Sequence, residues 1–125
     1  MDSEWKEVTI KDIAIVKGGK RLPKGENLST RPTNHPYIRS KDINVDRIVA
    51  QDMEFVPDKV FERIKRYIVH ENDVIITIVG ANCGNCALVP RSLNKANLTE
   101  NCAKILPISG EILSSKFLFQ FLRST

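Results

Sequence analysis

The stretch Tyr67-Ile-Val-His-Glu-Asn-Asp-Val-Ile-Ile-Thr-Ile-Val-Gly-Ala-Asn-Cys-Gly-Asn-Cys-Ala-Leu-Val-Pro90 decides the fold of this chain. Residues 74–79 form an apolar β-branched run interrupted only by Thr77, which suits a strand buried on both faces. Residues 80–85 are rich in glycine and asparagine, which tolerate positive φ, so we expect the chain to turn back there. Residues 87–89 supply a return strand that Pro90 ends. The tip of this hairpin is either a plain turn or a contact surface on a rigid base.

The composition is that of one globular domain of ordinary size. Of the 125 residues, 42% are hydrophobic, which is enough for a core. Lys and Arg number 19 and Asp and Glu 15, so the net charge of +4 permits a nucleic-acid partner without requiring one. No apolar run approaches the roughly 20 residues of a membrane span, and the acidic, polar start is not a signal peptide. Because three cysteines is an odd number in a chain without a secretory signal, we expect a cytoplasmic protein with reduced thiols.

Short elements are expected on both sides of the hairpin. They are a helix over 10–15 capped by Thr9, strands at 35–39, 48–56 and 102–108, a helix opening at Pro57-Asp58, and a helix from Ser114. The last helix has an apolar stripe with Phe119 off it, and because it stops at Thr125 we expect the native chain to continue. The pattern predicts an α+β fold: a single compact domain with a mostly antiparallel twisted sheet, short helices and a C-terminal helix that begins a longer one.

Residues 17–33, here called the basic loop, form a long segment without a periodic pattern. Five glycines and prolines prevent regular structure there, and Glu26 is its single acid. Its cations are Lys17, Lys20, Arg21, Lys24 and Arg31. A loop of this length is either a solvated, mobile surface segment or an arm that follows the phosphates of a nucleic acid.

Arg39 ends the expected strand at 35–39 and has two interpretations. Its guanidinium either forms a structural ion pair with a neighbouring acid such as Asp42 or points at a phosphate or a guanine edge. A second group of charges, formed by Glu62, Arg63, Lys65 and Arg66, lies on the outer face of the helix opened by Pro57, and we expect it to be solvated surface.

Cys83 and Cys86 have the two-residue spacing found in zinc knuckles and redox motifs. A tetrahedral zinc site needs four ligands, and Cys102, His35 and His70 complete one only if the fold brings them together. We favour plain turn cysteines, with metal binding and redox chemistry as alternatives. The two histidines are distant in sequence and no glycine motif for phosphate is complete, so we expect a non-enzymatic recognition module without cofactor or metal.

Several short motifs, in order, resemble one known family. Trp5, the Lys-Gly-Gly at 17–19 and the Pro-Tyr-Ile-Arg at 36–39 resemble the opening of a target recognition domain from the DNA-specificity subunit of type I restriction-modification systems. Residues 69–80 resemble its Gly-Asp-Ile-Leu-Ile segment, with Asn72 where the family usually has glycine, and Asn-Leu-Thr-Glu-Asn at 97–101 resembles its later Asn-Ile-Thr-x-Asn. The similarity covers nearly all of the chain. At the hairpin tip the family commonly has Gly-Thr-x-Gly-Lys, and this chain lacks the basic residue.

The resemblance implies a target recognition domain over 1–112 and the start of a spacer helix over 113–125. Such a domain would bind double-stranded DNA, read one half of a split target, and direct methyltransferase (modification) subunits and a restriction nuclease subunit. Phosphates would be held by the cations of the basic loop together with Arg39 and Lys41. Asn82 and Asn85 would pair with an adenine edge, and Arg39 or Arg21 with guanine. The alternatives are a recognition domain of a single-chain restriction-methyltransferase, or a small zinc or redox protein using the two tip cysteines.

Overall fold

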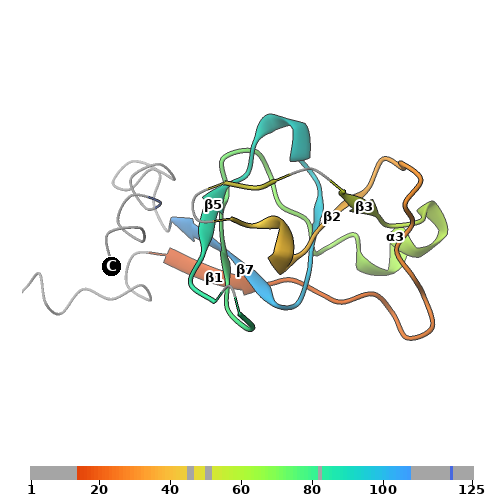
Figure 1. The fold of residues 1–125 in the computed structure, drawn as a ribbon, viewed down its shortest axis with the longest axis horizontal. Coiled ribbons are helices and arrows are strands. Elements are labelled where there is room, and N and C mark those ends of the chain that lie inside the picture. Colours follow the sequence, from red (N-terminus) through yellow and green to blue (C-terminus); the bar gives the residue numbers. More distant parts are fainter. Residues whose placement is uncertain (1–13, 45–46, 50–51, 82, 108–118, 120–125) are drawn as a thin grey trace, which may run out of the picture.

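The computed structural model describes residues 14–44, 47–49, 52–81, 83–107 and 119 (Figure 1). In Figure 1 a four-stranded sheet, a three-stranded sheet and the helix α3 follow one another from left to right. The elements are β1 (Ala14–Gly18), β2 (Pro36–Ile38), η1 (Ser40–Asp42), β3 (Glu54–Phe55), α3 (Asp58–Ile64), β4 (Val74–Thr77), β5 (Cys86–Leu88), η2 (Arg91–Leu93), β6 (Asn97–Leu98) and β7 (Cys102–Pro107).

The strands form two sheets where the sequence led us to expect one. The larger has the order β1-β7-β4-β5 and is antiparallel throughout. The smaller has the order β3-β2-β6, in which β2 pairs antiparallel with β3 and parallel with β6. The expectation of a mostly antiparallel α+β fold is therefore confirmed. The expectation that the strands form a single sheet was wrong. β2 has only three residues and pairs with strands of two, so these strands make a small sheet of their own.

β4 and β5 form the predicted hairpin. Gly80 and Gly84 take the positive φ angles expected of the turn, 108° and 97°. β4 ends at Thr77, however, and the next two residues, Ile78 and Val79, are 46% and 55% exposed. The β-branched run thus buries three of its first four positions, leaves Ile76 half-buried, and carries its last two out to the hairpin tip.

The main core lies between the two sheets. Ile75 of β4 and Cys102 of β7 meet Ile38 of β2 and Leu98 of β6, all of them almost completely buried. Successive side chains of a strand point to opposite faces of its sheet, so the same strands present other residues to their outer faces. This arrangement fixes the position of both sheets relative to the loops that they carry.

A second core lies on the opposite face of the small sheet. There Tyr37 of β2 packs against Val60 and Ile64 of α3. The helix begins at Asp58 after Pro57, as the sequence predicted. Within the described residues, no helix has the length and apolar character that crossing a membrane requires.

Phe119 covers the outer face of the larger sheet. It is 7% exposed and packs with Val74, Cys86 and Ile105. The rest of the helix expected from Ser114 lies outside the described residues. So does most of the helix expected over 10–15, although its last two positions belong to the strand β1 and the helix does not extend over them.

Candidate nucleic-acid interface

The first two residues of the basic loop, Lys17 and Gly18, belong to β1, so the expectation that its glycines prevent regular structure was wrong there. Beyond β1 the loop is attached at once to the ends of two other strands. The Gly19 backbone N–H donates to the carbonyl of Cys102 in β7 at 3.0 Å, and the Lys20 N–H donates to the carbonyl of Leu98 in β6 at 2.8 Å. The Tyr37 hydroxyl in turn donates to the Lys20 carbonyl at 2.8 Å. The start of the basic loop is therefore held by both sheets.

Gly19 permits this close approach because it has no side chain. A Cβ at this position would lie 2.1 Å from the carbonyl oxygen of Thr99 and 2.3 Å from that of Leu98. A Cβ at the neighbouring Gly18 would meet nothing within 4 Å. The requirement for glycine is thus specific to position 19.

The middle of the basic loop is packed as well. Ser29 and Phe55 of β3 exchange backbone hydrogen bonds of 2.8 and 2.9 Å. Leu22 and Leu28 pack against the core between β2 and α3. Gly25, at φ 87°, supplies the positive angle of a tight turn between them. The basic loop is therefore packed along the body of the domain, unlike the mobile surface segment of the first interpretation, and its phosphate-following role stays a prediction.

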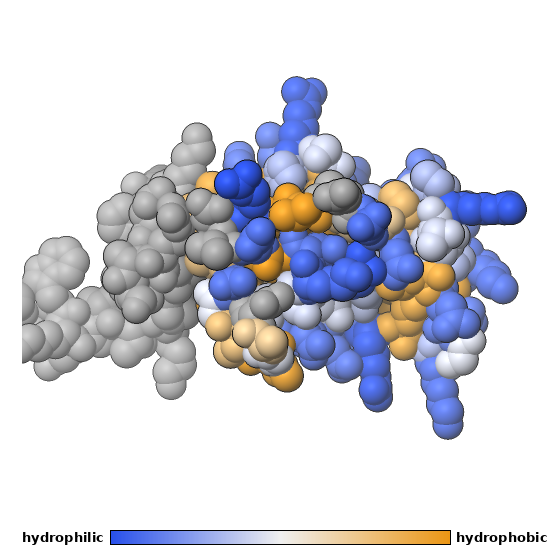
Figure 2. All heavy atoms as spheres, in the orientation of Figure 1, coloured by the Kyte–Doolittle hydropathy of each residue, from blue (hydrophilic) through white to orange (hydrophobic). Residues whose placement is uncertain are grey.

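The basic loop keeps its cations in solvent. Its acid, Glu26, lies 3.6 Å from Arg63 of α3 and so is engaged by a cation outside the loop. Arg21 is 4.0 Å from Glu100, but both side chains are largely exposed, and such pairs contribute little. The exposed cations are Lys17, Lys20, Arg21, Lys24 and Arg31, together with Lys41 on η1. Figure 2 shows one face of the domain, on which hydrophilic residues predominate and apolar patches are small.

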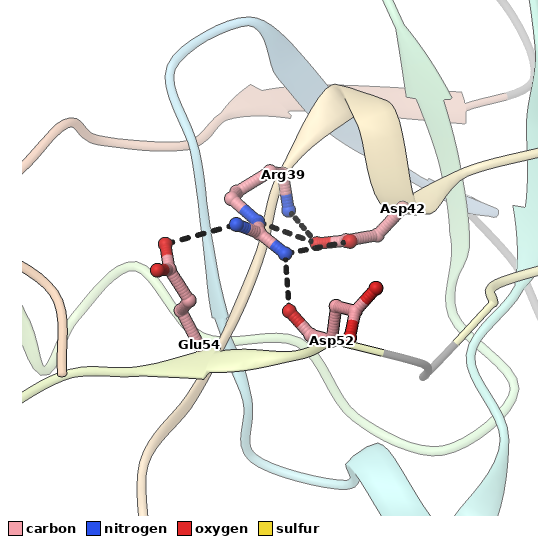
Figure 3. A network of polar contacts seen from close by, with 4 residues as sticks. All are labelled: Arg39, Asp42, Asp52 and Glu54. Carbon is pink, nitrogen blue, oxygen red and sulfur yellow. Dashed lines mark hydrogen bonds and ion pairs between the residues drawn. The ribbon is translucent and has the colours of Figure 1, made fainter. Parts of the chain in front are cut away.

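Arg39 lies inside a polar network instead (Figure 3). Its Nε and Nη2 donate to the two carboxylate oxygens of Asp42 at 3.0 Å, Nη1 donates to Glu54 Oε1 at 2.9 Å, and Nη2 also donates to the Asp52 carbonyl at 2.9 Å. Its side chain is 16% exposed and that of Asp42 only 3%. The hydrogen bond with Asp42 raises the pKa of Arg39 above its ordinary value. This geometry supports the ion-pair interpretation, in which Arg39 fastens β3 to η1.

The hairpin tip supplies less polar surface than its sequence suggests. Asn85 is half-buried, and its Nδ2 lies 3.5 Å from the carbonyl oxygen of Ile43. Asn82 lies outside the described residues. The exposed apolar side chains of Ile78 and Val79 lie at the same tip. Among the described residues, the tip therefore combines the apolar side chains of Ile78 and Val79 with the side-chain amide of Asn85.

A small pocket joins one predicted contact, Lys17, to two cations outside the predicted set, Arg66 and Lys104. Its volume is about 220 Å³, and it is lined by Lys17, Gly18, Gly19, Arg66, Tyr67, Ile68, Leu98 and Lys104. The sequence predicts a solvated helix face at Arg66 and an apolar strand around Lys104. A lysine inside the sequence Cys-Ala-Lys-Ile-Leu is a signal that could have drawn attention to this position.

Comparison with known proteins places the chain in a family. A family model described as the type I restriction modification DNA specificity domain matches residues 2–125. The chain belongs to this family. Its fold is similar to the crystal structure of the S subunit of a type I restriction-modification system from M. genitalium, with a TM-score of 0.63 and 20% sequence identity over 94% of this chain. The chain spans 25% of that S subunit. A search of curated proteins found no match.

Specificity domains of this family are non-catalytic DNA-recognition modules, so the expectation that this chain has no enzymatic activity of its own is confirmed. The family match does not favour the alternatives of a zinc protein or a redox protein. In this specificity domain Cys83 is exposed at the hairpin tip, and Cys86 and Cys102 are buried in two different cores. Burial raises the pKa of Cys102 to about 11, so the thiol stays protonated near neutral pH. Among the described residues, no three of the types His, Cys, Asp and Glu are grouped so as to hold a metal ion.

Asn72, where the resemblance led us to expect glycine, has a φ of 71°, in the left-handed region. Asparagine is among the side chains that adopt this conformation most readily, so the backbone takes it before β4 at small cost.

Proposed function

We propose that this specificity domain reads one half of a split target in double-stranded DNA and directs the methyltransferase and nuclease subunits of a type I restriction-modification complex in the cytoplasm. The observation that carries the proposal is the family match over residues 2–125, joined to a basic loop fixed on a β scaffold with its cations exposed.

In this proposal the exposed cations hold phosphates. Lys and Arg that neutralise phosphates release condensed counterions, which supplies affinity that does not depend on base sequence. Contacts of this kind set the register and orientation of a protein on the duplex. Because the basic loop is attached at Lys20 and at Ser29, its cations lose less conformational entropy on binding than those of a free segment. The proposed phosphate contacts are Lys17, Lys20, Arg21, Lys24, Arg31 and Lys41.

Base edges are assigned to amides at the hairpin tip and to one arginine. Asn82 and Asn85 would pair with an adenine edge, and Arg21 with guanine. Arg39 takes a supporting role, because its guanidinium already bonds to three residues of the domain and holds η1, which carries Lys41. We assign residues 1–112 to the recognition domain and 113–125 to a spacer helix that would separate the two half-sites.

Neutralising three cations of the basic loop tests the phosphate role. The variant Lys20→Gln/Arg21→Gln/Lys24→Gln should bind all duplex sequences more weakly, and the slope of log K against log salt should flatten by about 0.9 for each phosphate that is no longer neutralised. Fluorescence anisotropy with several labelled duplexes at a series of salt concentrations measures both quantities. The control is Lys59→Gln/Lys65→Gln/Arg91→Gln, which removes the same charge from exposed positions outside the proposed contacts.

Two outcomes contradict the proposal. A wild-type domain whose affinity shows no salt dependence would have no phosphate contacts. A basic-loop variant that changes base preference while keeping its overall affinity would reverse the assigned roles, because phosphate contacts carry no direct sequence information.

A further inference from the structure

Two lysines stand directly opposite each other in the larger sheet. Lys17 of β1 pairs with Lys104 of β7 in antiparallel register. Side chains at such positions lie on the same face with Cβ atoms roughly 4.5–5.5 Å apart, and like charges there destabilise the pairing. Arg66, which follows α3, lines the same pocket. None of the described residues that line this pocket is acidic, so its three cations have no carboxylate partner among them.

Neutral groups hold two of these cations in place. The Lys104 Nζ donates to the carbonyl oxygen of Ile68 at 2.9 Å. The Arg66 guanidinium carbon lies 5.8 Å from the centre of the Tyr67 ring, within the range of a cation–π contact. Both contacts orient a cation and leave its charge uncompensated. Lys104 is half-buried, so its field is less screened than that of a fully exposed lysine.

The pocket has the size and lining of a site for a small anion. Its volume of about 220 Å³ lies below the roughly 300–1,000 Å³ of sites for drug-sized molecules. Gly18 contributes backbone without a side chain to its wall, and a Cβ there would meet nothing within 4 Å, which allows a ligand to approach closely. A phosphate group matches both the charge and the size.

We propose that this pocket binds one phosphate group of the DNA backbone through Lys17, Arg66 and Lys104. The inference rests on the proposed DNA-recognition function and adds Arg66 and Lys104 to it. The pocket lies where the basic loop leaves β1. A backbone phosphate held there fixes the DNA strand whose further phosphates the rest of the basic loop contacts. As a backbone contact, it fixes register and does not select sequence.

The test compares two double variants in the 125-residue chain. Lys17→Gln/Arg66→Gln removes two pocket cations and leaves the Lys104 hydrogen bond intact, and Lys59→Gln/Arg91→Gln removes the same charge from exposed positions elsewhere. The pocket variant should flatten the slope of log K against log salt for duplex DNA by about 0.9, with base preference unchanged. The control should keep the wild-type slope, and thermal melting should show that both variants are folded.

The outcomes separate this inference from the proposed function. If the Lys20/Arg21/Lys24 variant flattens the slope and the pocket variant does not, DNA recognition stands and the phosphate pocket is refuted. If wild-type binding is independent of salt, both proposals fail together.

A free phosphate shares the chemistry of a backbone phosphate, and a second measurement distinguishes them. The amide resonances of Gly18 and Gly19 should shift when duplex DNA is titrated into the wild-type chain, and should not shift in the pocket variant. If inorganic phosphate shifts them and duplex DNA leaves them in place, the pocket is a free-anion site and the assignment to DNA is overturned.

Discussion

At the scale of single residues, Arg39 shows what local sequence can and cannot decide. The pattern brought Asp42 to attention because it lies three positions away, but Glu54 and the Asp52 carbonyl come from a different segment. Only the fold brings these acceptors together, which is why the structural and DNA-contact interpretations could not be separated from the sequence. The pairing of Lys17 with Lys104 could not be predicted for the same reason, since neither local sequence indicates the other residue as its partner.

Removing the Arg39 guanidinium should destabilise the domain. Arg39→Met keeps the length of the side chain and leaves the buried Asp42 carboxylate without its partner, which we expect to lower the free energy of unfolding by about 3 kcal/mol. Urea denaturation measures the change. Lys41→Met is the matched control, because Lys41 is exposed and its loss should change stability by no more than about 0.5 kcal/mol. A loss below about 1 kcal/mol for Arg39→Met would put the network on a level with surface pairs.

At the scale of elements, periodicity and turn chemistry were sufficient where an element carries its own signal. The β4–β5 hairpin, the helix α3 after Pro57 and the strand β7 all lie where the sequence predicted them. The expected helix over 10–15 failed at its end because residues 14–18 pair with β7, a tertiary contact that overrides weak local propensity. The parallel pairing of β2 with β6 was not predicted, since nothing in either short segment specifies a partner so far along the chain.

The junction between β1 and the basic loop gives a prediction at this scale. Gly19→Ala places a methyl group against the carbonyls of Leu98 and Thr99, so we expect it to lower the free energy of unfolding by about 2 kcal/mol or more. Gly18→Ala, one residue earlier, meets nothing within 4 Å and should be close to neutral. Thermal melting of the two variants side by side makes the comparison. Equal losses in both would show that the contact between this junction and β6 is dispensable.

At the scale of the whole molecule, composition and ordered motifs predicted the α+β class and the family, and the family match confirms the second. The division into two sheets with α3 on the far side was beyond the sequence, because it depends on which short strands exchange partners. Phe119 illustrates the same difficulty. Helical spacing placed it off the apolar stripe, and yet it is buried on the outer face of the larger sheet.

Phe119 should therefore contribute to the stability of the entire domain. Phe119→Ala removes an aromatic ring from the cluster of Val74, Cys86 and Ile105, and we expect a loss of about 3 kcal/mol in the free energy of unfolding. Ile78→Ala, which truncates an apolar side chain that is 46% exposed, should have a much smaller effect. Urea unfolding followed by circular dichroism gives both values. Matching losses in the two variants would mean that Phe119 does not act as a lid on the sheet.

The order of strands in the larger sheet has a consequence for biosynthesis. β7 is the last strand of the described chain to leave the ribosome, and it lies between β1 and β4, which are made much earlier. Until it emerges, β1 has no neighbour in that sheet, so a nascent chain exposes unpaired strand edges that attract chaperones or other chains. Folding of this sheet is thus a late event that awaits nearly complete translation of the domain.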